Sequence, residues 1–134
     1  MIIVVGYSPT KPGQAALLAG IEEAQQRHGS LVVLNASRGD AIYDPGFAQA
    51  ADLDWVRTTC TEAGVEFSVR QEVRGREPWE EIVDLVHEVK ADLCVIGIRH
   101  RTAVGKMLLG SNSHHVLMEA PCHVLSVKPT NNHG

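Results

Sequence analysis

Residues 91–116 read ADLCVIGIRHRTAVGKMLLGSNSHHV, which is an apolar run, a basic loop and the start of a polar segment. The run at residues 93–96 is short and ends at Gly97, as is typical of a strand buried on both faces. The segment after Gly110 opens with serine and asparagine, which favour the beginning of a helix. A strand that leads through a loop into a helix is the repeating unit of parallel α/β proteins.

The same unit recurs outward along the chain. Short apolar runs of the same kind, also expected to be buried on both faces, occupy residues 2–5, 31–34 and 124–127. Between the runs, apolar residues recur at steps of three and four, the spacing of one helix face, around residues 17–28, 53–63, 79–89 and 116–120. Gly64 suits the end of the second helix, and Pro78 suits the first turn of the third. Residues 65–73 instead alternate between apolar and polar types, which predicts a strand at an edge of the sheet.

This alternation of strands and helices predicts a single α/β domain over residues 1–129, with parallel strands and helices on both faces of the sheet. In such sheets, ligands bind beyond the carboxyl ends of the strands, where the strand order reverses. We therefore expect the ligand site in the segments after the first and fourth strands, residues 6–10 and 97–110. Residues 130–134 form a polar tail.

The composition of the 134 residues is that of an ordinary globular domain, with 44% hydrophobic and 21% charged residues. The net charge of −4 argues against a nucleic-acid binder, which would carry a basic surface. No apolar stretch approaches the length of a membrane span, and Met1 leads into an apolar run without the basic residues of a signal peptide. The three cysteines are widely spaced and form no CxxC pair. We expect a cytoplasmic protein with no nucleic-acid or membrane partner.

The loop that follows the fourth apolar run ends in groups that suit an anion. Gly110 permits close approach of a ligand to the backbone. Hydroxyl, amide and free N–H donors follow at the positive end of a helix, on Ser111, Asn112 and Ser113. Positive charge on the same loop comes from Arg99, Arg101 and Lys106. Such a cluster suits a polyphosphate. A solvated basic loop with an ordinary helix cap is the alternative.

The sequence does not match the arrangements of residues that would indicate catalysis or metal binding. Gly105-Lys106 is followed by Met107, so the loop is not a Walker A motif, and Asn112 occupies the place of the serine in a nucleophile elbow. His114 and His115 are about 100° apart on a helix, so we expect one exposed and one packed histidine rather than two ligands of one metal. A solvated acidic helix face is expected from Glu80, Glu81, Asp84 and Glu88. We expect neither catalytic residues nor a metal site.

Four stretches of the chain resemble the universal stress protein family. Gly97-x2-His100-x9-Gly110-Ser111 is similar to the family's nucleotide motif, G-x2-G-x9-G-[ST]. Residues 120–127, APCHVLSV, resemble its closing signature APCPVLVV. The stretches VRG at 73–75 and ADLCVIG at 91–97 also match the family pattern, so the resemblance covers nearly the whole chain.

The resemblance implies a five-stranded parallel sheet in the order 3-2-1-4-5, a Rossmann-like fold similar to that of the adenine nucleotide alpha hydrolases. It also implies a homodimer paired through the last strand, which begins near Cys122 and ends near Lys128. The implied role is in a stress response, and some members of the family bind ATP whereas others do not. With no catalytic residues expected, we expect a non-catalytic protein that binds ATP or another adenine nucleotide, with Mg²⁺ as the companion of ATP. By family position, the phosphate would lie among Gly97, Arg99, His100, Arg101, Gly110, Ser111, Asn112 and Ser113, the base near Ala36, and the ribose near Gly6, Tyr7 and Ser8.

Two residues depart from the family pattern. Ser8 stands where ATP-binding members carry an aspartate, and a serine is a weaker acceptor for a ribose hydroxyl. His100 replaces the second glycine of the motif, where its imidazole could contact phosphate. Tyr7 either closes the pocket with its ring or packs against the first helix. Two other functions stay open: a protein–protein module whose pocket has lost its ligand, and a slow nucleotide hydrolase, which lacks a water-activating group near the loop.

Overall fold

The computed structural model describes residues 1–99 and 109–129. Along these residues the elements alternate in the order β1 (Ile2–Gly6), α1 (Lys11–Arg27), β2 (Ser30–Ser37), α2 (Ala50–Glu62), β3 (Glu66–Val73), α3 (Pro78–Val89), β4 (Leu93–Gly97), α4 (Ser111–Glu119) and β5 (His123–Val127). The strands form one parallel sheet in the order β3-β2-β1-β4-β5. The α/β fold and the strand order expected from the sequence are confirmed.

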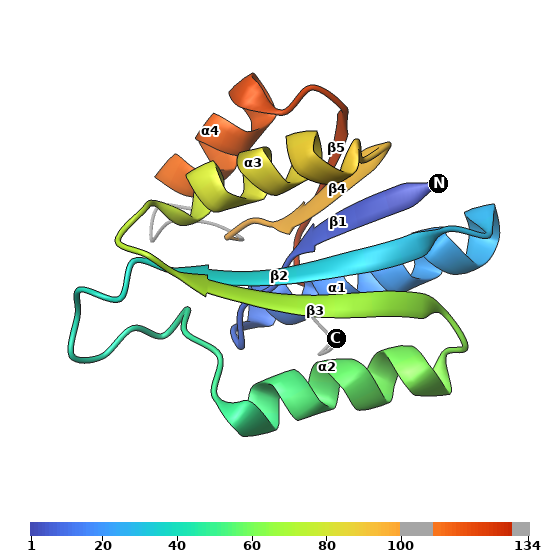
Figure 1. Ribbon diagram of the computed structural model, residues 1–134, viewed down its shortest axis with the longest axis horizontal. Helices are drawn as coiled ribbons and strands as arrows, with labels where there is room; N and C mark the ends of the chain where they lie inside the picture. The colour runs from blue at the N-terminus through green and yellow to red at the C-terminus, as the bar shows by residue number, and fades with distance from the viewer. Residues whose placement is uncertain (100–108, 130–134) are drawn as a thin grey trace.

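Apolar clusters lie on both faces of this sheet. The helices α1 and α2 cover one face, and α3 and α4 cover the other (Figure 1). Residues of β1 divide between the two faces: Ile3 and Val5 belong to the α1–α2 cluster, and Val4 belongs to the α3–α4 cluster. The first strand is therefore buried on both sides, as its continuous apolar run predicts.

Local signals account for the ends of the helices. The helix α1 begins after Thr10, whose side chain accepts a hydrogen bond from the N–H of Gly13, and it ends at His28 in the left-handed conformation (φ 54°). Gly64 (φ 73°) follows α2, and Pro78 is the first residue of α3, both as predicted. The helices α1, α3 and α4 each follow the carboxyl end of a strand, namely β1, β3 and β4.

The two edge strands differ from the central ones. The strand β3 alternates between exposed and half-buried residues over most of its length, which confirms the edge position predicted for it. The strand β5 is half-buried, so the expectation that residues 124–127 are buried on both faces is wrong. The physical reason is that β5 is the other edge of the sheet and has a neighbouring strand on one side only.

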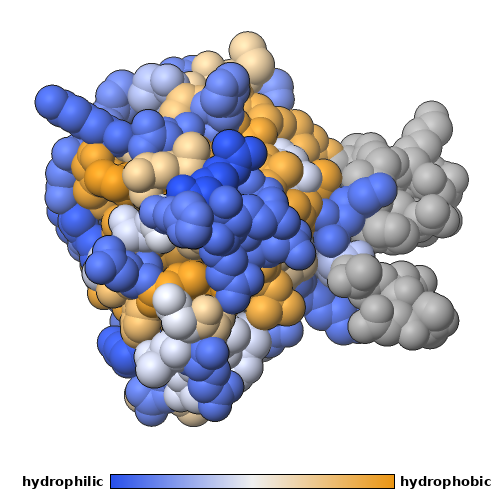
Figure 2. Space-filling view, turned by 90° about the vertical axis from the view of Figure 1, so that its right-hand side faces the viewer, coloured by the Kyte–Doolittle hydropathy of each residue, from blue (hydrophilic) through white to orange (hydrophobic). Residues whose placement is uncertain are grey.

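The carboxyl ends of the strands lie on the same side of the molecule as the loop of residues 38–49 and the beginnings of α3 and α4 (Figure 1). Figure 2 shows the other side, where the strands begin and hydrophilic residues interrupt the hydrophobic ones. Among the residues that the structure describes, none of the helices has the length and apolar character needed to cross a bilayer.

Candidate functional site

The first turn of α1 brings the ends of β1 and β4 together. Gly97, the last residue of β4, lies so close to the carbonyl of Pro12 that a side chain at position 97 would overlap with it. Gly13 lies equally close to the backbone of Ser8. Because Pro12 and Gly13 are neighbours, Ser8 and Gly97 both pack against this turn. Both expected site residues therefore lie where the strand order reverses.

The hydroxyl of Ser8 is held at the N-cap of α1. Its Oγ lies 2.7 Å from Oγ1 of Thr10, which accepts a hydrogen bond from the N–H of Gly13 at 3.3 Å. Ser8 is half-buried. It can offer a ribose a neutral hydroxyl, which is a weaker acceptor than the carboxylate that the family pattern places here.

The ring of Tyr7 packs in the core and does not cover the crevice. Tyr7 is 3% exposed, and its ring stacks on that of Trp55 in α2 with the centroids 6.2 Å apart. Burial, with a smaller effect of the Asp52 carboxylate, raises the pKa of Tyr7 to about 12. The ring was expected either to close the pocket or to pack against the first helix. The structure shows packing, in the cluster that α1 and α2 share.

Gly6 and Ala36 mark the ends of β1 and β2. Gly6 lies opposite Leu34 in the parallel register, so β2 extends past the end of β1 at Ala36. Ala36 is half-buried, packs with the α3–α4 cluster and pairs with Glu72 of β3. The backbone of β2 therefore lies beside the segment that begins at Gly6, where the base and the ribose are expected.

The start of α4 is open at Gly110. This N-cap residue has φ −65° and ψ 163°, an extended conformation that any residue can adopt. A side chain at this position would meet no atom of the described residues within 4 Å. The first helical bond runs from the N–H of His114 to the Gly110 carbonyl at 2.9 Å, so the N–H groups before it have no helical acceptor. Neither the described packing nor the backbone geometry requires a glycine here.

Two contacts from α3 hold the first turn of α4. Oδ1 of Asn112 accepts a hydrogen bond from the backbone N–H of Trp79 at 3.1 Å. The indole of Trp79 stacks on the imidazole of His115, with centroids 4.4 Å and planes 16° apart. His114 is exposed and His115 is packed, as predicted. Because the Asn112 oxygen is occupied, the Nδ2 donors are the part of this amide that remains for an anion.

The remaining expected phosphate contacts follow β4. Arg99 is exposed, one residue after Ile98, whose N–H donates to the carbonyl of Val127 at 2.8 Å. Arg99 therefore leaves the sheet directly at the ends of β4 and β5. His100 and Arg101 lie outside the described residues, and the phosphate contacts expected from them stay predictions.

A cavity of about 540 Å³ opens at the carboxyl ends of β1, β2 and β3. Its lining includes Pro9, Ser37, Tyr43, Asp44, Phe47 and Asp52. No expected site residue lines it, although Pro9 directly follows Ser8 and Ser37 directly follows Ala36. Its volume lies in the range of roughly 300–1,000 Å³ that is usual for small-molecule sites. Sequence analysis missed this cavity because its main wall is a loop, which has no apolar periodicity.

The wall of the cavity is shaped by Asp44. One carboxylate oxygen of Asp44 accepts from the hydroxyl of Ser37 at 2.6 Å, and the other accepts from the N–H of Gly46 at 2.8 Å. The Asp44-Pro45-Gly46 stretch is typical of a turn and is the one signal in the sequence that indicates an ordered loop here.

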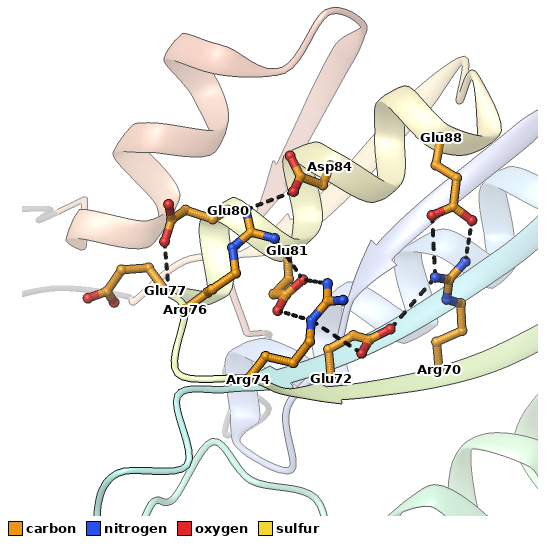
Figure 3. Close-up of polar contacts among 9 residues, drawn as sticks. All are labelled: Arg70, Glu72, Arg74, Arg76, Glu77, Glu80, Glu81, Asp84 and Glu88. Carbon is orange, nitrogen blue, oxygen red and sulfur yellow. Dashed lines mark hydrogen bonds and ion pairs between the residues drawn. The ribbon is translucent and has the colours of Figure 1, made fainter.

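Ion pairs between the β3–α3 connection and α3 lie beside the carboxyl end of β3 (Figure 3). Glu81, with 2% of its side chain exposed, lies between Arg74 and Arg76. Nε of Arg74 donates to Glu81 at 3.0 Å, and hydrogen bonding to this carboxylate raises the pKa of Arg74 above its usual range. The expectation that Glu81 belongs to a solvated face is therefore wrong, because arginines from the β3–α3 connection neutralise it. Within the described ranges, His, Cys, Asp and Glu side chains form no group of three or more that could hold a metal ion.

A doubly wound parallel sheet in this strand order defines a class of α/β proteins whose ligand crevice lies where the strand order reverses. Residues 1–128 match the model of the Universal stress protein family. The chain belongs to that family. It is 46% identical over 128 residues to a universal stress protein of Mycolicibacterium smegmatis, and the match covers 96% of this chain and 98% of the relative.

Solved structures of similar proteins agree with this assignment. A universal stress protein from Archaeoglobus fulgidus matches with a TM-score of 0.79 and 31% identity, covering 95% of this chain and 97% of that one. A universal stress protein from the same organism, in complex with dAMP, matches with a TM-score of 0.66 and 25% identity. The match covers 95% of this chain and 96% of the other. A universal stress protein in complex with cAMP matches with a TM-score of 0.74, 26% identity and coverage of 97% and 98%.

Proposed function

We propose that this protein binds an adenine nucleotide with its phosphate on the start of α4, and that it acts without catalysis in a cytoplasmic stress response. The observation that carries the proposal is Gly110, a glycine that the described packing and backbone do not require, at an open helix N-terminus. The complexes of similar proteins with dAMP and cAMP support the choice of an adenine nucleotide. The ligand class comprises AMP, ADP and ATP, the last with Mg²⁺.

The nucleotide would span the crevice from α4 to β2. Free N–H groups of the first turn of α4 and Nδ2 of Asn112 would meet the phosphate, with positive charge from Arg99 nearby. The hydroxyl of Ser8 would meet the ribose, and the backbone at Ala36 would meet the base. No bond forms or breaks in this scheme, so the nucleotide acts by favouring one state of the protein.

One observation favours the rival function, a protein–protein module without nucleotide. Ser8 replaces the aspartate of the family pattern, and its hydroxyl already pairs with Thr10. Calorimetric titration with AMP, ADP and ATP, with and without Mg²⁺, separates the two functions. Saturable heat with at least one nucleotide supports our proposal, and no heat with any of them supports the rival. Chromatography of the titrated samples detects turnover of ATP, which would contradict a non-catalytic role.

We also propose that two copies pair through β5. This strand is an edge of the sheet, and Leu125 and Val127 are half-buried hydrophobic residues on it. An edge strand leaves a row of backbone N–H and C=O groups unpaired, and a twofold arrangement of two such strands would satisfy both rows.

A further inference from the structure

Asn35 is a buried residue whose polar side-chain groups are all in use. It is 1% exposed. Its Nδ2 donates to the carbonyl of Tyr7 at 2.9 Å and to the carbonyl of Gly46 at 2.8 Å. Its Oδ1 accepts from the N–H of Ala48 at 3.0 Å and from Nε2 of Gln71 at 2.9 Å. An asparagine amide has two donor hydrogens and two acceptor lone pairs, and this arrangement satisfies all of them.

These bonds join segments that are far apart in the sequence. Gln71 lies opposite Asn35 in the β2–β3 register, and its Nε2 also donates to the carbonyl of Ala48 at 2.9 Å. Ala48 is therefore held through both its N–H and its C=O by side chains of the sheet. The loop of residues 38–49 is in this way fastened to β2 and β3.

Asn35 also sets the backbone from which Ser8 projects. The N–H of Tyr7 donates to the carbonyl of Leu34 at 2.8 Å, and the carbonyl of Tyr7 accepts from Asn35. Both backbone polar groups of Tyr7 are thus fixed by neighbouring residues of β2. The carbonyl of Tyr7 belongs to the same planar peptide group as the nitrogen of Ser8, so the bond from Asn35 fixes the peptide plane that leads into Ser8.

We propose that Asn35 is a positioning residue that couples occupancy of the nucleotide site to the loop of residues 38–49. The inference rests on the proposed function, because it requires a nucleotide in contact with Ser8. Such a nucleotide favours the orientation of the peptide between Tyr7 and Ser8 in which the Tyr7 carbonyl meets Asn35. Opening of the loop takes Gly46 and Ala48 away from the amide of Asn35 and leaves buried groups without partners. The bound state and the closed loop therefore favour each other.

Thermodynamic linkage makes this coupling reciprocal. If loop closure raises nucleotide affinity by a given factor, nucleotide binding favours loop closure by the same factor, typically about 5- to 150-fold. The loop is also a wall of the cavity and carries the exposed hydrophobic residues Ile42 and Tyr43. Nucleotide binding would therefore hold this apolar surface in one arrangement.

Hydrogen exchange on the unaltered protein gives the first test. The N–H of Ala48 donates to Asn35, so its exchange rate reports opening of the loop. Saturating AMP should slow exchange of Ala48 by about fivefold or more. The N–H of Gly64, which donates to the carbonyl of Thr61 after α2, is the control and should not change. Unchanged exchange of Ala48 in protein saturated with AMP would overturn the coupling.

Asn35→Leu, compared with Leu31→Ala, gives the second test. Leu31 is equally buried on β2 but lies near its beginning, away from the site. Both substitutions should lower stability, and only Asn35→Leu should weaken AMP binding, by about fivefold or more in calorimetry at a temperature where each variant is folded. Gln71→Met is the variant to use if Asn35→Leu does not fold. It keeps the bonds of Asn35 to Tyr7 and to the N–H of Ala48 and removes only the bond to the Ala48 carbonyl, so the loop is held less firmly and the slowing of exchange by AMP should diminish.

The possible outcomes separate this inference from the proposed function. An unaltered protein that binds none of AMP, ADP and ATP rejects both. Binding by the unaltered protein, with equal affinities for Asn35→Leu and Leu31→Ala, rejects only the role of Asn35. If Asn35→Leu does not fold, the exchange of Ala48 in Gln71→Met decides. If AMP slows this exchange as much as in the unaltered protein, the coupling is rejected. The inference is supported if Asn35→Leu loses AMP affinity and Leu31→Ala does not, or if AMP slows Ala48 exchange less in Gln71→Met than in the unaltered protein.

Discussion

The Oδ1 atom of Asn112 and the backbone N–H of Trp79 are joined by a hydrogen bond of 3.1 Å between residues that lie 33 positions apart. The bond ties the first turn of α4 to the first turn of α3. Only the oxygen of the amide takes part, so the contact with α3 and the expected contact with phosphate involve different atoms of one side chain. Substitution can therefore separate the two roles of Asn112.

Asn112→Asp should weaken nucleotide binding without loss of stability. The carboxylate keeps an acceptor for Trp79, and its charge is favourable in the first turn of a helix, so the free energy of unfolding should stay the same or rise slightly. The same charge repels phosphate, and AMP affinity should fall at least about tenfold, or ~1.4 kcal/mol. Urea denaturation and calorimetry measure the two effects. Asn112→Ala is the control: it should lose about 1 kcal/mol of stability, with a smaller loss of affinity. Equal losses of affinity in both variants would contradict the assignment.

Gly110→Val should also weaken AMP or ATP binding at least about tenfold, because its side chain would occupy the space next to the free N–H groups. Stability should hardly change, since φ is −65° and a side chain meets no described atom within 4 Å. Gly64→Ala is the opposite case. Gly64 has φ 73° and equally open surroundings, so alanine should cost about 1 kcal/mol of stability and leave affinity unaltered. An unchanged dissociation constant in Gly110→Val would remove the phosphate from this helix.

Arg74→Met should lower the melting temperature through Glu81. The buried carboxylate would keep Arg76, at 3.4 Å, as its partner among the described residues. Losing a partner of a buried charge destabilises more than losing an exposed pair, so the fall should be at least roughly twice that in Arg57→Met, whose pair with Asp54 is exposed. Thermal denaturation followed by circular dichroism measures both. The double variant Arg74→Met/Glu81→Met should recover part of the loss. Equal falls in the two arginine variants would mean that Glu81 is solvated.

Alkaline pH should destabilise the protein partly through Cys60. Burial raises the pKa of this thiol from 9.0 to about 11, so the folded state holds the proton more tightly than the unfolded chain does. The resulting stabilisation is complete below the unfolded pKa and is lost as pH rises through the folded pKa. Between about pH 8 and about pH 10.5, the free energy of unfolding in urea should therefore fall less in Cys60→Ala than in the unaltered protein. Part of the fall should remain, because burial also raises the pKa of Tyr7 and of Cys94 to about 12. Parallel pH profiles would contradict this role of Cys60.

Val127→Lys should convert the proposed dimer to a monomer. Val127 lies opposite Gly97 at the end of β5 and packs beside the α1–α2 cluster, so a lysine there would place a charge at the edge where the copies are proposed to pair. Sedimentation velocity should show the monomer, with helical circular dichroism retained. Val69→Lys on the other edge strand is the matched control, because Val69 is also half-buried and packs against the same cluster, and it should leave the dimer intact. An unaltered protein that sediments as a monomer at micromolar concentration would rule out the pairing.

The positions of the strands and helices follow from the spacing of apolar residues, because each element needs a continuous buried face. The order of the strands came from the family resemblance rather than from spacing. Spacing also predicts too short a second strand: its apolar run ends at residue 34, whereas β2 continues to Ser37. Asn35 and Ser37 are polar and still buried, because partners elsewhere in the chain satisfy them.

Contacts within one stretch of chain can be predicted from the sequence, and contacts between distant residues cannot; the parts of the site divide in this way. The start of α4 could be predicted because Gly110 and its donors are consecutive residues. The burial of Glu81 and the bonds of Asn35 and Asn112 could not, because their partners come from other elements. A sequence shows which side chains carry donors and acceptors, and only the folded chain determines which of them meet.

The two stacked aromatic pairs give the molecule a pair of optical reporters. The chain has two tryptophans, and they stack on different rings. Trp79 stacks on His115 beside the start of α4, and Trp55 stacks on the buried ring of Tyr7. Fluorescence of a Trp55→Phe protein would thus follow the surroundings of Trp79, and fluorescence of a Trp79→Phe protein would follow the surroundings of Trp55. The emission of one chain, recorded in two variants, can show whether a ligand alters the start of α4, the packing between α2 and Tyr7, or both.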